Sequence, residues 1–158
     1  MKTTTSPSSI ASFVSLRRVA LAGVSRSGRG FGAAAMKELL AKGYDVVPVH
    51  PAGGVLEGRQ AAASLAAVTP PVEGVLVVLK PAEAAMTVRE AAASGIRRVW
   101  LQQGAESDEA LAAAREHGVD LVQGHCILMF ARPHGLHRFH GWLWKKLGLA
   151  PDAHPHQA

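Results

Sequence analysis

The sequence lacks the features that define several classes of protein. It has one cysteine, Cys126, among 158 residues, so no internal disulfide framework can form and a reducing compartment is expected. No apolar run approaches the roughly 20 residues that cross a bilayer. Residues 1–16 are too broken in pattern for a secretory signal. These absences predict a cytoplasmic protein that has no membrane partner.

The composition is poor in aromatic residues, at 5%, and in charged residues, at 18%. Apolar residues make up 48%, which indicates a globular chain with a core of small aliphatic side chains. The net charge of +5 favours an anionic ligand. No basic patch interleaved with aromatics occurs before residue 130, so nucleic acid is not the expected partner.

Catalytic and metal-binding patterns are also missing. No serine–histidine–acid set and no pair of carboxylates stands in the candidate loops described below. His137 and His140 could share a helix face but lack a third ligand, so no metal site is predicted. The sequence therefore predicts no catalytic residue, and whether the protein is an enzyme stays open with a preference against it.

What the chain does have is an alternation of strand and helix patterns. Glycines follow the three predicted helices, where the left-handed conformation suits a helix end. The strand patterns are continuously apolar, which indicates that both sheet faces are covered. The fold class is therefore α/β, a Rossmann-like doubly wound parallel sheet of about five strands with helices on both faces. Strands are expected over 18–24, 44–50, 72–79, 97–103 and 119–123, and helices over 31–42, 81–94 and 108–117.

Other segments complete the predicted organisation. The connection over 52–71 is expected to be irregular, with one helical turn at 60–67. In the helix that begins at Pro81, Thr87 is expected on the polar face with Glu83 and Glu90. The predicted parts are a tail with a short helix capped near Ser6 (1–16), the main domain (17–130), a helical extension (131–150) and a disordered tail (151–158). The extension is expected to pack on the body through Leu136, Phe139, Leu143 and Leu147.

In doubly wound sheets the ligand lies at the carboxyl ends of the strands. This rule nominates the loops 23–30, 50–54, 80–81, 103–106 and 124–126. The first loop, with several glycines before a helix, is suited to a phosphate. Ser25 replaces the second glycine of the dinucleotide pattern G-x-G-x-x-G, and no Gly-Lys-Ser/Thr triplet follows, which excludes a Walker loop.

The remaining loops leave several roles open. The second strand ends at His50 and Pro51, where an NAD-binding protein carries an acid, so NAD is disfavoured. Lys80 is either a ligand cation or a solvated lysine. Gln102 and Gln103 either contact a ligand or fix loops. Cys126 is either buried and inert or lies on the ligand side, where a mixed disulfide with a thiol ligand is a further hypothesis.

The motifs VALAGVSR, KGYDVVPVHP, VLVVLKP, GIRRVWLQQG and HC, taken in order over residues 18–128, resemble a known family. This is the family of small bacterial CoA-binding proteins with a Rossmann-like domain, related to the CoA-binding domain of the succinyl-CoA ligase alpha subunit. The resemblance implies that coenzyme A lies across the strand ends. The cofactor-binding residues that it implies are Gly23, Val24, Ser25, Arg26, Arg29, Gly30, Phe31, His50, Pro51, Leu79, Lys80, Pro81, Gln103, Gly104 and Cys126.

The sequence departs from the family pattern at the second strand. Many members have Asn or Ser in place of His50 and a Lys soon after Pro51, where this chain has Ala52-Gly53-Gly54. Arg26 or Arg29 would then have to bind the 3′-phosphate. The expected function is a non-catalytic CoA or acyl-CoA binding protein. The alternatives are an NAD(P)-linked redox or sensor protein of the same fold, and an interaction protein that uses its basic C-terminal segment.

Overall fold

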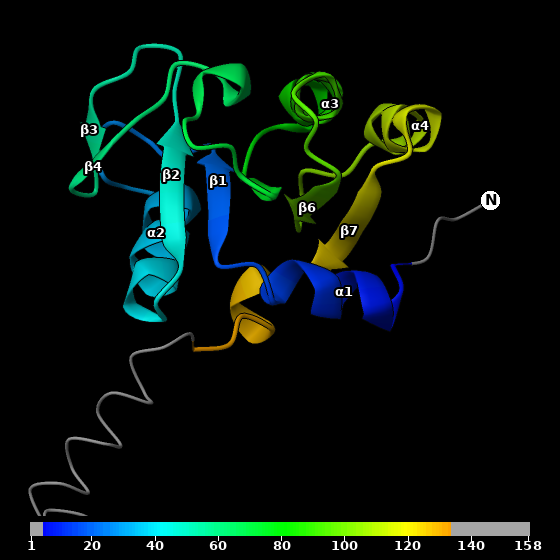
Figure 1. Cartoon of the computed structure of the whole chain (residues 1–158), viewed down its shortest axis with the longest axis horizontal. Coiled ribbons are helices and arrows are strands. Elements are labelled where there is room, and N and C mark those ends of the chain that lie inside the picture. The colour runs from blue at the N-terminus through cyan, green and yellow to red at the C-terminus, as the bar shows by residue number, and fades with distance from the viewer. Residues whose placement is uncertain (1–4, 134–158) are drawn as a thin grey trace, which may run out of the picture.

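A computed structural model describes residues 5–133 and shows a five-stranded parallel sheet of order β2-β1-β5-β6-β7 (Figure 1). The strands are β1 (Arg18–Ala22), β2 (Asp45–Val49), β5 (Gly74–Val77), β6 (Arg98–Gln102) and β7 (Asp120–His125). Each lies inside or within two residues of a predicted strand. The predicted Rossmann-like fold class is confirmed. From residue 134 on, the predicted extension and tail lie outside the described residues.

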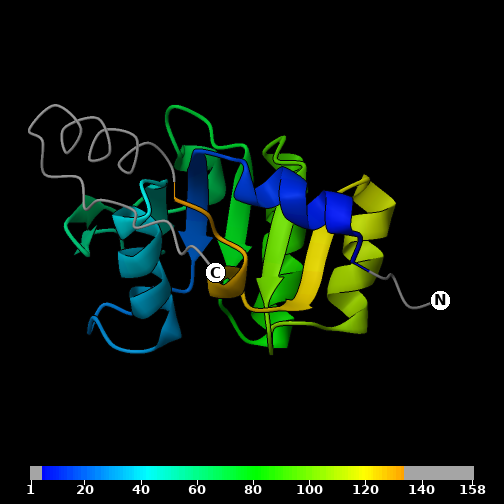
Figure 2. The ribbon, with the colours of Figure 1, turned by 90° about the horizontal axis from the view of Figure 1, so that it is seen from below.

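Helices cover both faces of the sheet (Figure 2). One face carries α1 (Pro7–Val14) and α2 (Phe31–Ala41), and the other carries α3 (Pro81–Ala93) and α4 (Asp108–His117). Ser6 caps α1 by accepting a hydrogen bond from the Ser9 amide at 3.0 Å, and Gly118 ends α4 in the left-handed conformation. Within residues 5–133, no helix has the length and hydropathy to cross a membrane.

The side chains of each central strand divide between two cores. Ala20 and Val75 point toward α3 and α4, whereas Leu21, Leu76 and Trp100 point toward α1 and α2. All five are completely buried. Successive residues of a strand face opposite sides of the sheet, so two helix-covered faces require a continuous apolar run.

The segment after β2 differs from the expected irregular connection. It forms an antiparallel hairpin of β3 (Val55–Leu56) and β4 (Arg59–Gln60), and then a short helix, η1 (Leu65–Ala67). The helical turn is thus shorter than the predicted 60–67. Glu57 and Gly58 form the hairpin turn with φ of +48° and +75°. Such a turn favours Asn or Asp at its first position, so Glu57 gave no hairpin signal.

Asp45, the first residue of β2, forms ion pairs with β1 and with the β3–β4 hairpin. Its carboxylate pairs with Arg18 on β1 and accepts a hydrogen bond from Arg59 on β4 at 2.8 Å. Partial burial raises the pKa of this carboxyl, but the Arg18 and Arg59 guanidinium groups outweigh that effect and hold its pKa below 3.8.

We expect the substitution Asp45→Asn to lower the free energy of unfolding near neutral pH by at most about 1 kcal/mol, because the ion pairs are partly exposed. A depressed pKa in the folded state contributes stability that is lost as the pH falls below 3.8. Urea denaturation should therefore show that the wild type and the variant have nearly equal free energies of unfolding in acid. A difference that persists in strong acid would contradict this explanation.

Candidate functional site

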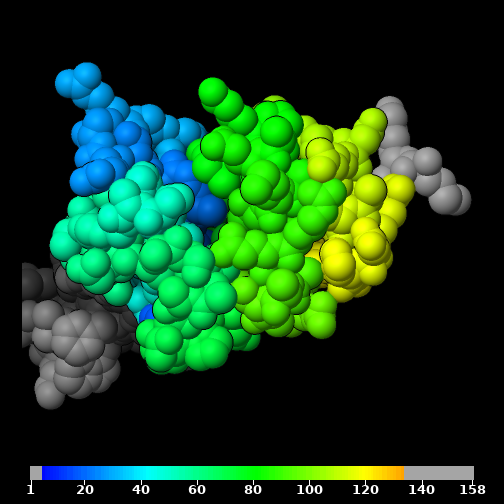
Figure 3. Space-filling view, turned by 90° about the horizontal axis from the view of Figure 1, so that it is seen from above, coloured from blue at the N-terminus to red at the C-terminus, as the bar shows by residue number. Residues whose placement is uncertain are grey.

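The carboxyl ends of β1, β2, β5 and β6 border a cleft of about 900 Å³, within the range of small-molecule sites. Figure 3 shows it as a hollow between the atoms of residues 45–65 and those of the α3 region. The cleft is lined by Ala22, Gly23, Val24, Ser25, Val49, His50, Pro51, Ala63, Ser64, Leu65, Val78, Leu79, Lys80, Pro81, Glu83, Met86, Thr87, Glu90, Gln102, Gln103, Gly104 and Ala105.

Two glycines let the backbone approach closely at the start of this cleft. Gly23 has φ of +115°, and a Cβ atom on it would overlap the carbonyl group of Val78. A Cβ atom on Gly32, in the first turn of α2, would overlap the carbonyl group of Gly23. The loop after β1 is therefore held between β5 and α2, and it brings the start of α2 to the sheet edge.

The start of α2 is suited to an anion. Gly30 occupies the N-cap position, no side chain accepts a hydrogen bond there, and the first turn has no acidic residue. The free N–H groups and the positive end of the helix dipole favour a negative ligand. Ser25, on the loop before the helix, lines the cleft and its Oγ lies 2.7 Å from Oγ of Ser27.

His50 presents a hydrogen-bond donor at the end of β2. Its Nδ1 accepts a hydrogen bond from the Ala52 amide at 3.0 Å. The neutral ring therefore carries its hydrogen on Nε2, which can donate to a ligand oxygen. The backbone of His50 is fixed as well, because its amide donates to the carbonyl of Ala62 at 2.9 Å.

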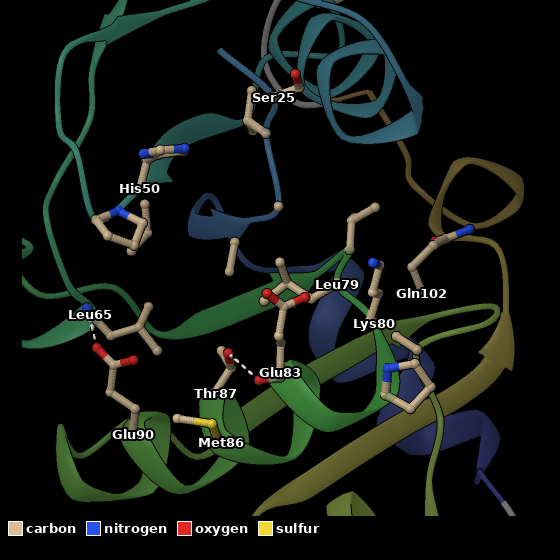
Figure 4. Close-up of a pocket in the computed structure, with 18 of the residues that line it drawn as sticks. Ser25, His50, Leu65, Leu79, Lys80, Glu83, Met86, Thr87, Glu90 and Gln102 are labelled. Atoms are coloured by element: carbon tan, nitrogen blue, oxygen red, sulfur yellow. Dashed lines mark hydrogen bonds between the residues drawn. The ribbon is translucent and has the colours of Figure 1, made fainter. Parts of the chain in front are cut away.

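The α3 side of the cleft was not predicted. Glu83, Met86, Thr87 and Glu90 line it, on the opposite side from Ser25 (Figure 4). Thr87 lies on the same helix face as Glu83 and Glu90, as expected, but this face borders the cleft and Thr87 is only 8% exposed. Its Oγ1 donates to the Glu83 carbonyl at 2.9 Å, which satisfies the hydroxyl within the helix.

Glu90 joins this helix to the chain after β2. Its Oε1 accepts a hydrogen bond from the Leu65 amide at 2.7 Å, at the start of η1 (Figure 4). The spacing of residues 83, 86, 87 and 90 places them on one helix face. That spacing was visible in the sequence, but only the tertiary structure shows that this face borders a cleft.

Hydrogen bonds also fix the loops after β6 and β7. Gln102 is buried, and its Oε1 accepts a hydrogen bond from the Ile127 backbone amide at 3.1 Å. The Gln102 side chain therefore fixes the loop after β7. The Glu106 carboxylate accepts from the amides of Gly104, at 2.7 Å, and Gly124, at 3.0 Å. Gln103 stays exposed beside the cleft and is available to a ligand.

The structure divides the predicted site residues into two groups. Those that line the cleft are Gly23, Val24, Ser25, His50, Pro51, Leu79, Lys80, Pro81, Gln103 and Gly104. Those outside its lining are Arg26, Arg29, Gly30, Phe31 and Cys126. Cys126 directly precedes a short helix, η2 (Ile127–Met129), whose Ile127 belongs to the core under α1 and α2. The ligand contacts of both groups stay predictions.

Comparison with known proteins identifies the family. Residues 17–132 match the family described as a CoA binding domain. The chain belongs to this family, and the resemblance found in the sequence is confirmed.

Solved structures share the fold. A conserved hypothetical protein from Pyrococcus furiosus is 32% identical, with a TM-score of 0.68, covering 72% of this chain and 97% of that one. A hypothetical protein from Pyrococcus horikoshii OT3 is 29% identical, with a TM-score of 0.73. The match covers 78% of this chain and 88% of that one. The dinucleotide-forming acetyl-coenzyme A synthetase 1 of Ca. Korarchaeum cryptofilum is 16% identical, with a TM-score of 0.59, covering 66% of this chain and 25% of that one. At that identity the likeness shows the fold alone.

We expect the substitution Gly23→Ala to destabilise the protein through overlap with Val78 as well as through backbone strain. The matched control is Gly53→Ala, because Gly53 has φ of +60° but open space around its Cα. The control should lose about 1–2 kcal/mol of unfolding free energy from strain. Gly23→Ala should lose a further ~1–3 kcal/mol from overpacking. Equal losses in urea denaturation would show that the close approach at Gly23 is unimportant.

Proposed function

We propose that the protein binds coenzyme A or an acyl-CoA in the cleft at the strand ends and does not transform it. The observation that carries the proposal is a cleft of about 900 Å³ at the strand ends of a member of the CoA binding domain family. In parallel α/β sheets this edge is where nucleotide ligands bind.

The diphosphate is assigned to the loop Gly23–Ser25 and the start of α2. The uncapped first turn of α2 supports this assignment, because it offers backbone N–H groups to an anion. The Ser25 hydroxyl, which lines the cleft, can donate to a phosphate oxygen. The Gly23 φ of +115° orients this loop.

The 3′-phosphate of CoA is assigned to Arg26 and Arg29. Other cations near the β2 side are already paired: Lys37 with Glu57 at 3.5 Å, and Arg59 with Asp45 at 2.8 Å. Arg26 and Arg29 are both exposed on the loop after β1 and have no salt bridge within residues 5–133. Long, unpaired guanidinium groups can reach a phosphate beyond the cleft wall.

The pantetheine arm is assigned to the side lined by Leu79, Pro81 and Gln103. An apolar wall with a few polar groups suits this arm, which combines methylene and amide groups. The three hydroxyl groups in the lining interact with groups that are not bases: Ser25 with Ser27, Ser64 with the Ala67 amide and Thr87 with the Glu83 carbonyl. None has the hydrogen bond to a base that activates a nucleophile, which supports binding without catalysis. Glu90, one of the two carboxylates in the lining, already accepts the Leu65 amide.

We expect CoA and acetyl-CoA to raise the melting temperature and NAD to leave it unchanged, since the end of β2 carries His50 in place of an acid. Ligand at 100 times its dissociation constant should add about 2.7 kcal/mol of stability.

Dephospho-CoA lacks the 3′-phosphate, so comparing its affinity with that of CoA isolates the contribution of this phosphate. Calorimetric titration should show that the double variant Arg26→Ala/Arg29→Ala weakens CoA binding about tenfold or more, but dephospho-CoA binding much less.

The control is Arg17→Ala, because Arg17 is exposed just before β1, at the amino end of the sheet, and its removal also lowers the net charge. This variant should bind CoA as the wild type does. Stabilisation by NADP without stabilisation by CoA would reject the proposal in favour of a redox or sensor protein. Equal weakening of CoA and dephospho-CoA in the double variant would reject the assignment of the 3′-phosphate alone.

A further inference from the structure

A second hollow, of about 670 Å³, lies between α1 and the chain that follows η2, on the face that α1 and α2 cover. Figure 2 shows α1 and this last described segment on the near side of the sheet. The hollow, here called the α1 groove, is lined by Thr5, Pro7, Ile10, Ala11, Val14, Ser15, His125, Phe130, Arg132 and Pro133.

The floor of the α1 groove is apolar. Ile10 and Val14 are one helical turn apart on α1 and face it together. Phe130 forms the opposite wall and is held in place by Trp100 and His125, with ring centroids 6.0 and 5.4 Å away. An apolar groove of this kind suits the apolar side of a second helix.

The chain leaves the described structure at the edge of this groove. Pro133 lines the groove, and Arg132 is fixed because its amide donates to the Tyr44 hydroxyl at 3.3 Å. Burial raises the pKa of Tyr44 above 10.0, so the hydroxyl keeps its proton and donates to the Val14 carbonyl at 2.7 Å. Tyr44 thereby ties the exit of the chain to the end of α1.

We propose that residues 134–150, here called the C-terminal segment, occupy the α1 groove as an amphipathic helix. The segment places Leu136, Phe139, Leu143 and Leu147 at helical spacing, so one face of such a helix is apolar. Lys145 falls on the opposite face. The other parts of the chain outside the description, residues 1–4 and 151–158, lack such a stripe.

Chain length favours this occupant over a second molecule. Leu136 follows Pro133 by three residues, a reach of at most about 10 Å. The eight residues of α1 span about 12 Å, so a helix over residues 136–147 can lie along its whole length. A tether this short gives the C-terminal segment a high effective concentration at the groove. This inference concerns a groove that shares no lining residue with the cleft at the strand ends, and it does not depend on the proposed function.

The test is intrachain disulfide formation in the full chain. In a Cys126→Ser background, Ala11→Cys is combined in turn with Phe139→Cys, Leu143→Cys or Leu147→Cys. Ala11 is exposed and lines the groove, so its substitution should leave the fold intact. Under mild oxidation, at least one pair should give a monomeric disulfide in most chains, detected by non-reducing electrophoresis and intact mass. A disulfide needs Cα atoms about 5.5 Å apart, so it reports close contact.

Two controls match this test. The first control combines Ala11→Cys with Lys145→Cys, which places the second thiol opposite the apolar face of the proposed helix. The second combines Ala93→Cys with Leu143→Cys, which places the first thiol at the exposed end of α3, away from the groove. Both pairs should stay mostly reduced. Three outcomes would overturn the proposal: no intrachain disulfide in any test pair, equal oxidation of the controls, or disulfides that join two chains, which would assign the groove to a second copy.

Discussion

The close approach of backbone at Gly23 is the constraint on which the rest of the site depends. Gly23 lies so near the Val78 carbonyl, and Gly32 so near the Gly23 carbonyl, that no side chain fits at either position. This contact closes the gap between β1, β5 and α2. It also places the uncapped start of α2 after the loop whose residues Gly23, Val24 and Ser25 line the cleft. A larger residue at Gly23 or Gly32 would separate the helix from the sheet, and with it the N–H groups from the proposed diphosphate position.

Around that contact, side chains far apart in the sequence hold the cleft walls. Glu90 on α3 fixes the Leu65 amide, and Glu106 ties the loop after β6 to Gly124. Gln102 does the same for Ile127. Each of these three side chains accepts at least one hydrogen bond from the backbone, and these bonds fix the segments that surround the cleft. The exposed groups that remain at its edge, such as Gln103, are the ones free to determine what it binds.

The sheet was predictable because continuous apolar runs and helix-ending glycines are local signals. The strand-end rule then placed most of the predicted site residues around one cleft. The hairpin at Glu57 was missed because its turn lacks the usual Asn or Asp. The buried position of Thr87 was missed because an amphipathic pattern shows that a helix has a polar face, but not whether solvent or a cleft lies beside it. Hydrogen bonds such as Glu106 to Gly124 join distant loops and have no sequence signal.

The central claim, that CoA binds at the strand ends, is tested most directly by titrating ¹⁵N-labelled protein with CoA and following its backbone amide resonances. The account predicts that the signals of Gly23, Ser25, His50 and Gln103 shift together as CoA is added. Signals of the α1 groove, such as those of Ala11 and Phe130, should stay in place. Shifts confined to the α1 groove, or an unchanged spectrum at saturating CoA, would contradict the account.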